Sequence, residues 1–180
     1  MKPETFKVQG LTVAIHQDTD PTSPEENQDE NAFLVTTKNR YFEVRPDWCQ
    51  TPDNAEQLAE THYLYPVLAY IHSGVALSLS AIGQFSDPWD AGRIGTLAIT
   101  KDASEIPFPQ EYAEGMIEEW NQYLSGDVWG YTITRKGEQI DSCWGFFGID
   151  YAREEATASA KAIANYRKAE RLKIAAMMHL

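Results

Sequence analysis

The chain has 180 residues, a length typical of one domain, and its 43% hydrophobic and 12% aromatic residues suffice for an ordinary packed core. This composition excludes a wholly disordered chain and a fibrous repeat. Fifteen lysines and arginines against 27 aspartates and glutamates give a formal charge of -12, which argues against capture of nucleic acid or an anionic membrane by a basic face and favours basic, neutral or metal-bearing partners.

Alternating apolar and polar side chains predict a half-buried strand over residues 11–16. Residues 18–31 follow, with two prolines, six acids and no large apolar side chain, so we expect a mobile acidic loop. The runs 32–37 and 41–44 are typical of a hairpin. A short helix is predicted over residues 54–61, with Asp53 as its N-cap.

The middle of the chain predicts a second hairpin, made of strands at residues 65–71 and 75–80 joined by His72, Ser73 and Gly74. A loop is expected over residues 83–93 and a strand over 94–100.

A helix is predicted after Pro109, because large apolar residues recur there with helical period and Gly126 stands where the helix should stop. The periodic residues are Tyr112, Met116, Ile117, Trp120 and Leu124. Strands at residues 128–134 and 139–147, with a turn at Lys136 and Gly137, form a third predicted hairpin.

The C-terminal residues 151–179 are rich in alanine, contain no proline or glycine and predict one long helix. Hairpins with helices between and after them indicate an antiparallel sheet covered on one side by helices, which is the α+β class. We expect residues 1–180 to form a single domain.

Several sequence features are missing. No apolar run indicates a secretory signal or a membrane span, so we expect a cytoplasmic protein. Cys49 and Cys143 are more typical of two free thiols than of a disulfide. No CxxC pair, Walker A loop, GxGxxG or HExxH occurs, and we expect no cofactor.

Charge is distributed unevenly. Residues 1–150 carry a formal charge of -15 and residues 151–180 carry +3. Within the predicted helix, the spacing of Glu111, Glu114 and Glu118 places the three carboxylates along one side, about 5 to 6 Å apart. This row indicates either a solvated helix face or, together with Asp87 and Asp90, a surface for a basic partner.

Three sequence motifs are similar to those of other proteins. They read YPxxxYxHSG from Tyr65, PWDxGxxG from Pro88, and DSCWGFxG from Asp141. Together they resemble an uncharacterised family of small proteins encoded by bacteriophages, plasmids and other mobile elements. The resemblance covers roughly residues 64–150 and implies a mobile-element origin, but it brings no activity and no catalytic residues.

The same motifs contain groups able to do chemistry. Cys143 as a thiolate could pair with His72 as a base, with Asp90 or Asp141 orienting the imidazole. A cysteine on a strand beside Trp144 is more often a small buried hydrophobe, which is the favoured interpretation of Cys143. His72 and the neighbouring Ser73 would point to opposite faces of a strand and serve each other poorly, so a turn role is favoured for them.

A metal site is a further alternative. Asp87, Asp90 and Asp141 together with His72 offer oxygen and imidazole ligands for a divalent ion, although their spacing does not demand one. Asp90 and Arg93 are more simply read as an ion pair or a turn cap. We therefore lean toward a function that is not enzymatic.

Three functions remain open. The first is an acidic mobile-element protein that binds and inhibits a host defence complex of the anti-CRISPR or anti-restriction type, by mimicking nucleic acid on that complex's basic surface. The second is an oligomeric accessory module such as a homodimer, in which basic residues of the C-terminal helix dock on another copy: Arg167, Lys168, Arg171 and Lys173. The third is a small Cys/His or metal-dependent hydrolase using His72, Cys143, Asp90 and Asp141.

Overall fold

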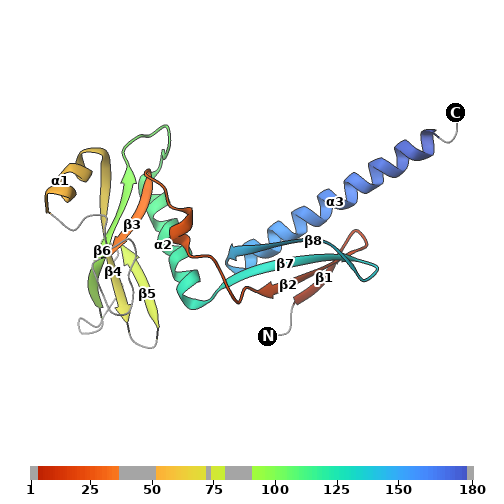
Figure 1. Ribbon diagram of the computed structural model, residues 1–180, viewed down its shortest axis with the longest axis horizontal. Coiled ribbons are helices and arrows are strands. Elements are labelled where there is room, and N and C mark those ends of the chain that lie inside the picture. The colour runs from red at the N-terminus through yellow and green to blue at the C-terminus, as the bar shows by residue number, and fades with distance from the viewer. Residues whose placement is uncertain (1–3, 37–51, 72–73, 80–90, 178–180) are drawn as a thin grey trace. The chain divides into compact units, whose positions relative to one another are not determined.

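The computed structural model describes residues 4–36, 52–71, 74–79 and 91–177 (Figure 1). The chain divides into two compact units: unit 1 is Met1–Pro21 with Gly126–Leu180, and unit 2 is Thr22–Ser125. Within the described residues, each unit is built on an antiparallel four-stranded sheet. The expected α+β class is confirmed, with the strands divided between two sheets.

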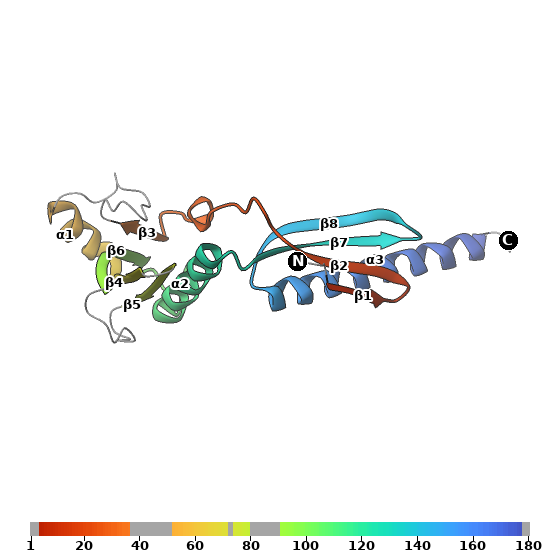
Figure 2. The same ribbon diagram turned by 90° about the horizontal axis from the view of Figure 1, so that it is seen from below.

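Unit 1 contains β1 (Glu4–Val8), β2 (Leu11–Gln17), β7 (Val128–Arg135), β8 (Glu138–Phe147) and the helix α3 (Ile149–Met177). The strands pair in the order β1-β2-β7-β8. Helix α3 runs along one face of this sheet and continues past the ends of the strands (Figures 1 and 2). The expected long C-terminal helix is therefore confirmed, and β1 is a strand that the sequence pattern did not predict.

The core of unit 1 lies between the sheet and α3. Alternation along β2 turns Leu11, Val13 and Ile15 toward the helix. Alanines at four-residue spacing on α3 meet this face: Ala152, Ala156 and Ala160, all fully buried. Their small side chains let the helix approach the sheet closely, which explains the alanine-rich composition of this segment.

The chain leaves and re-enters unit 1 at neighbouring points. The Gln17 side chain donates to the Gly126 carbonyl at 2.9 Å, and the Asp18 N–H donates to the Val128 carbonyl at 2.8 Å. Strands β2 and β7, which flank unit 2 in the sequence, therefore pair directly with each other in the sheet of unit 1. Unit 2 is an insertion between two adjacent strands of unit 1.

Unit 2 carries its own sheet in the order β3-β6-β4-β5. Its elements are η1 (Pro24–Asn27), β3 (Ala32–Thr36), α1 (Pro52–Thr61), β4 (His62–Ile71), β5 (Val75–Leu79), β6 (Ala91–Thr100) and α2 (Pro109–Ser125). On one face, Ile117 and Trp120 of α2 pack into the main core. On the other face, Leu58 of α1 packs against a smaller cluster around Phe33.

Several local predictions in unit 2 need correction. Helix α1 begins at Pro52, so Asp53 lies in its first turn and not at the N-cap. Proline suits the first helical position because its missing N–H has no partner to find there. The strand expected over 94–100 begins earlier, at Ala91. Strand β3 pairs with β6, and its expected hairpin partner at residues 41–44 lies outside the described residues.

Helix α2 follows the prediction in all but one residue. Gly126, with φ of 74°, ends the helix as expected, because glycine adopts this left-handed conformation without strain. Tyr112 was expected on the apolar stripe but is 49% exposed. The stripe is centred on the fully buried Ala113, and adjacent residues on a helix are turned by about 100° from each other.

Local hydrogen bonds organise the acidic segment 18–31, which was expected to be a mobile loop. The Ser23 hydroxyl accepts from the Glu25 N–H and caps η1, whose Pro24 is buried. The Gln28 side chain accepts from the Leu34 N–H at 2.9 Å and ties the segment to β3. Among the described helices, none has both the length and the apolar character to cross a bilayer.

Candidate functional site

The net charge of the protein belongs to unit 2. Its sequence contains 17 acidic and 5 basic side chains, a formal charge of -12, whereas unit 1 contains ten of each and is formally neutral. The imbalance seen along the sequence is therefore an imbalance between two compact units. Any electrostatic steering of a cationic partner starts from unit 2.

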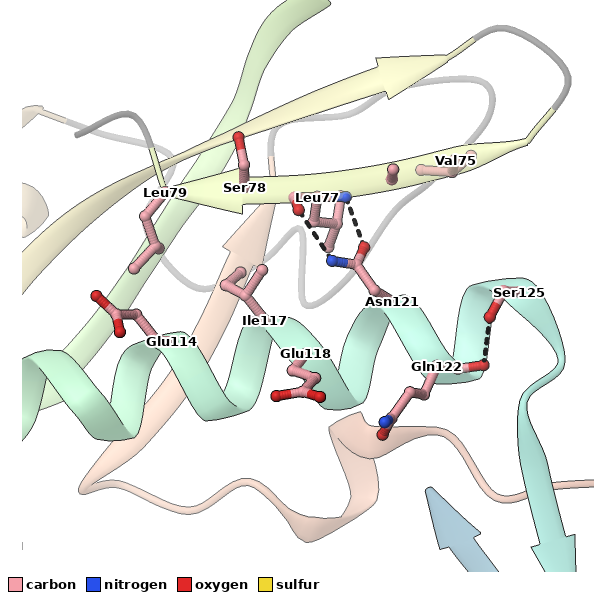
Figure 3. Close-up of a pocket in the computed structure, with 11 residues that line it drawn as sticks. Val75, Leu77, Ser78, Leu79, Glu114, Ile117, Glu118, Asn121, Gln122 and Ser125 are labelled. Carbon is pink, nitrogen blue, oxygen red and sulfur yellow. Dashed lines mark hydrogen bonds between the residues drawn. The ribbon is translucent and has the colours of Figure 1, made fainter. Parts of the chain in front are cut away.

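A groove of about 750 Å³ lies in unit 2 between α2 and β5 (Figure 3). Its lining from the strand is Val75, Ala76, Leu77, Ser78 and Leu79; its lining from the helix is Glu114, Ile117, Glu118, Asn121, Gln122 and Ser125. The floor is apolar where Ile117 packs with Leu77, and the helix wall is acidic and polar. This volume is in the range of ordinary ligand sites.

The groove follows β5, which is the edge strand among the described strands of its sheet. The edge of a sheet presents backbone groups to any extended partner. Asn121 occupies the centre of this edge: its Oδ1 accepts from the Leu77 N–H at 2.7 Å, and its Nδ2 donates to the Leu77 carbonyl at 3.0 Å. The Asn121 amide thus takes the place of a paired strand and fixes the helix against β5.

Two of the three carboxylates predicted for partner binding line this groove. Figure 3 shows Glu114 on the side of α2 near Leu79, and Glu118 one turn further along the helix. Glu111 is exposed on the preceding turn but lies outside the lining. Glu114 accepts a hydrogen bond from Gln110 at 3.1 Å. The ion pairs recorded among the described residues involve none of these three carboxylates.

The acids of α2 affect each other and their neighbours. Burial, and then the charge of Glu118, raise the pKa of Glu119. Burial also raises the pKa of the Tyr65 hydroxyl, and the charges of Tyr63 and Glu114 add to this effect. In both cases burial is the larger cause, and the neighbouring negative charge adds to it because negative charge opposes further ionisation of an acid.

The described cations of unit 2, Arg93 and Lys101, lie outside the groove lining. Arg93 donates to the Thr96 hydroxyl at 3.2 Å. Lys101 donates to the Ala59 carbonyl at 2.6 Å and lies 5.7 Å from the centre of the Tyr63 ring. The groove is therefore lined by carboxylates but by no described cation of unit 2.

Two members of the predicted catalytic group, Asp141 and Cys143, lie among the described residues. Asp141 accepts a hydrogen bond from the Ser159 hydroxyl at 2.7 Å, which ties β8 to α3. Cys143 is an exposed free thiol, so the expectation of a small buried hydrophobe is wrong. Its strand β8 is the edge strand among the described strands of its sheet, so Cys143 has a described neighbouring strand on one side only, where it lies opposite Tyr131 of β7. The other predicted members, His72, Asp87 and Asp90, lie outside the described residues, as does Cys49.

The described residues contain no cluster of three or more histidine, cysteine, aspartate or glutamate side chains placed to hold a metal ion. Of the described tryptophans, Trp120 is buried, whereas Trp144 is 48% exposed. A Cβ on Gly130 would lie 2.3 Å from the Trp144 ring, so the indole lies directly against this glycine.

The sequence did not predict the role of Asn121, because no local pattern indicates its contact with a strand 44 residues away.

No family model matches the chain, and it matches neither a curated protein nor a solved structure.

Proposed function

We propose that the protein is a non-enzymatic binding protein whose acidic unit 2 docks on the basic, nucleic-acid-binding surface of a host defence complex and thereby inhibits it. The observation that carries the proposal is the concentration of the whole formal charge of -12 in unit 2, with exposed carboxylates along α2 that have no described ion pair. The inhibition is of the anti-CRISPR or anti-restriction type.

The physical basis is competition for a positively charged groove. Duplex DNA presents one charge per about 1.7 Å of its axis and owes much of its affinity to such grooves. Residues three or four positions apart on a helix have Cβ atoms about 5 to 6 Å from each other, and Glu111, Glu114 and Glu118 follow this spacing. A surface of this kind is steered to the same groove by long-range attraction and occupies it.

Origin and compartment are part of the same proposal. The motifs beginning at Tyr65, Pro88 and Asp141 resemble those of phage and plasmid proteins, and a protein of that origin acts in the cytoplasm of its bacterial host. Asp87 and Asp90, in the second motif, are proposed to extend the acidic surface. A mobile element gains directly from a protein that disables a complex directed against foreign nucleic acid.

The proposal is tested by affinity purification of the tagged chain from a bacterial host that carries such complexes, with nucleases added to the lysate. We expect the captured protein to be a nucleic-acid-binding complex, and we expect an excess of its DNA or RNA to displace it. Purified protein should in turn block nucleic acid binding by that complex. Capture that survives high salt unchanged would contradict the role of the carboxylates.

A specific observation favours a second function, an oligomeric accessory module. The end of α3 exposes several large apolar side chains: Tyr166, Leu172, Ile174 and Met177, with exposed fractions of 58 to 75%. Such residues in one helical segment are typical of contacts with another copy or a partner helix. A monomer in light scattering at micromolar concentration would count against it.

A further inference from the structure

A second cleft, in unit 1, is cationic. It has a volume of about 630 Å³ and lies among the β1–β2 turn, the β7–β8 turn and α3. Its lining is Gln9, Gly10, Leu11, Arg135, Lys136, Ala164, Arg167, Lys168, Arg171 and Leu172. Five of these ten side chains are arginine or lysine, and none is acidic. This is unexpected in a chain with a formal charge of -12.

The helix wall of the cleft arises where α3 runs past its sheet. Residues four apart share a face of a helix. The series that begins with the core residue Ile163 continues with Arg167 and Arg171. The face that packs on the sheet therefore changes from apolar to cationic at the level of the turns, and both views show α3 continuing beyond them (Figures 1 and 2).

The opposite wall is built from two tight turns. Gln9 and Gly10 have φ of 48° and 84°, and Lys136 and Gly137 have φ of 52° and 86°. Positive φ at both central residues is the signature of a type I′ turn, which is short and matches the twist of its strands. Because β2 pairs with β7, the two turns lie side by side and hold Arg135 and Lys136 in fixed positions.

Among the described residues, Arg153 is the cation in every recorded ion pair. The five cations of the cleft therefore have no recorded carboxylate partner there. Like charges gathered in one cleft repel each other, so their convergence costs stability unless an anion occupies it. The cleft has the size of a small-molecule site, and arginine binds phosphate oxygens in a bidentate manner.

We propose that this cleft binds a compact soluble ligand bearing two or more phosphate groups, such as a nucleoside triphosphate or an inorganic polyphosphate. Five positive charges around about 630 Å³ match several negative charges held in a small volume. A long nucleic acid fits less well, because the acidic unit 2 repels an extended polyanion. The ligand is distinct from the basic partner proposed for unit 2.

The test is calorimetric titration of the full chain with inorganic tripolyphosphate at low salt. We expect saturable binding that Arg167→Gln/Arg171→Gln weakens about tenfold or more, since each replaced side chain removes a charge-assisted hydrogen bond. The matched control is Lys161→Gln/Lys173→Gln, which removes two cations of α3 outside the lining and should change the affinity less than threefold. Circular dichroism reports the fold of each variant.

Lys136→Gln provides an independent variant at an exposed turn should the arginine variant unfold, and we expect it to weaken binding about threefold or more. Three results would overturn the proposal: no tripolyphosphate binding by the unaltered chain, equal losses in the cleft and control variants, or tighter binding of a 20-nucleotide DNA that tripolyphosphate cannot displace. Self-association that the arginine substitutions abolish would also overturn it, in favour of a second copy as the occupant.

Discussion

Asn121 satisfies both backbone groups of Leu77, accepting from its N–H at 2.7 Å and donating to its carbonyl at 3.0 Å. One side chain of α2 thus closes the edge of β5 that would otherwise be open to pairing with another chain. The same contact sets the width of the acidic groove, because it fixes the helix against the strand. The groove and the closed edge depend on one residue.

Asn121→Ala should therefore destabilise the protein by about 1 to 2 kcal/mol, because two hydrogen bonds are lost and Leu77 is left to be solvated through the groove. Urea unfolding followed by circular dichroism measures the change. Gln122→Ala, on the same turn of α2 and without a recorded side-chain hydrogen bond, is the control and should cost less than about 0.5 kcal/mol. Equal losses in the two variants would show that the amide contributes nothing special.

Gly95 of β6 has no room for a side chain. A Cβ at this position would lie 2.1 Å from the Val35 carbonyl oxygen, a backbone atom of the paired strand β3. Gly95→Ala should thus force the two strands apart at a cost of about 3 kcal/mol or more. Gly92→Ala on the same strand meets nothing within 4 Å and should leave the thermal midpoint almost unchanged. A well-folded Gly95→Ala variant with native stability would refute the β3–β6 register.

The ion pair between Glu4 and Arg153 ties β1 to α3 and should give unit 1 an acid-sensitive component. Hydrogen bonds from Arg153 hold the pKa of Glu4 below its ordinary value of 4.5. A carboxyl whose pKa is lowered by folding stabilises the fold above its ordinary pKa, and this contribution is lost as the pH falls through the lower, folded value.

Glu4→Gln should accordingly lower the thermal midpoint at pH 7, and the gap to the unaltered protein should close as the pH falls below about 4.5. Calorimetry between pH 7 and pH 3 measures both midpoints. The control Glu154→Gln removes an exposed carboxylate of α3 that has no recorded ion pair and should leave the thermal midpoint at pH 7 almost unchanged. A constant gap at all pH values would contradict the assignment.

Unit 1 should fold without unit 2. Its core is its own, and the contacts Gln17 with Gly126 and Asp18 with Val128 bring the two cut ends together. A chain in which a short Gly/Ser linker replaces residues 22–125 should give a mixed helix and strand circular dichroism spectrum and a cooperative thermal transition. An unfolded spectrum would instead support the single domain expected over residues 1–180.

Local patterns predicted most elements, because a strand, a tight turn and a helix each have a short-range signature. Alternation marked β2, and glycine marked the end of α2 at Gly126 and the β7–β8 turn at Gly137. The division into two units was not predictable, since the pairing of β2 with β7 joins residues more than 100 positions apart. A local sequence pattern does not indicate which strands pair with each other.

The candidate site shows the same limit. The spacing of Glu114 and Glu118 indicated that they share one side of a helix, and both line the groove. The groove itself depends on where α2 meets β5, which is a tertiary contact. The cationic cleft was equally hidden, because Arg135 and Lys136 are about 30 residues from Arg167 and Arg171 and meet them only through the sheet.

The proposed role of unit 2 is that its carboxylates bind a basic, nucleic-acid-binding partner. Its most direct test compares capture by the unaltered chain, by Glu111→Gln/Glu114→Gln/Glu118→Gln, and by the charge-matched control Glu138→Gln/Glu154→Gln/Glu155→Gln, whose exposed carboxylates belong to unit 1. We predict that the unaltered chain and the control retain the partner, whereas the α2 variant binds it at least tenfold more weakly. The affinity of the unaltered chain and of the control should also fall more steeply with salt concentration than that of the α2 variant. Equal retention by all three proteins, or capture of no nucleic-acid-binding complex at all, would contradict the account.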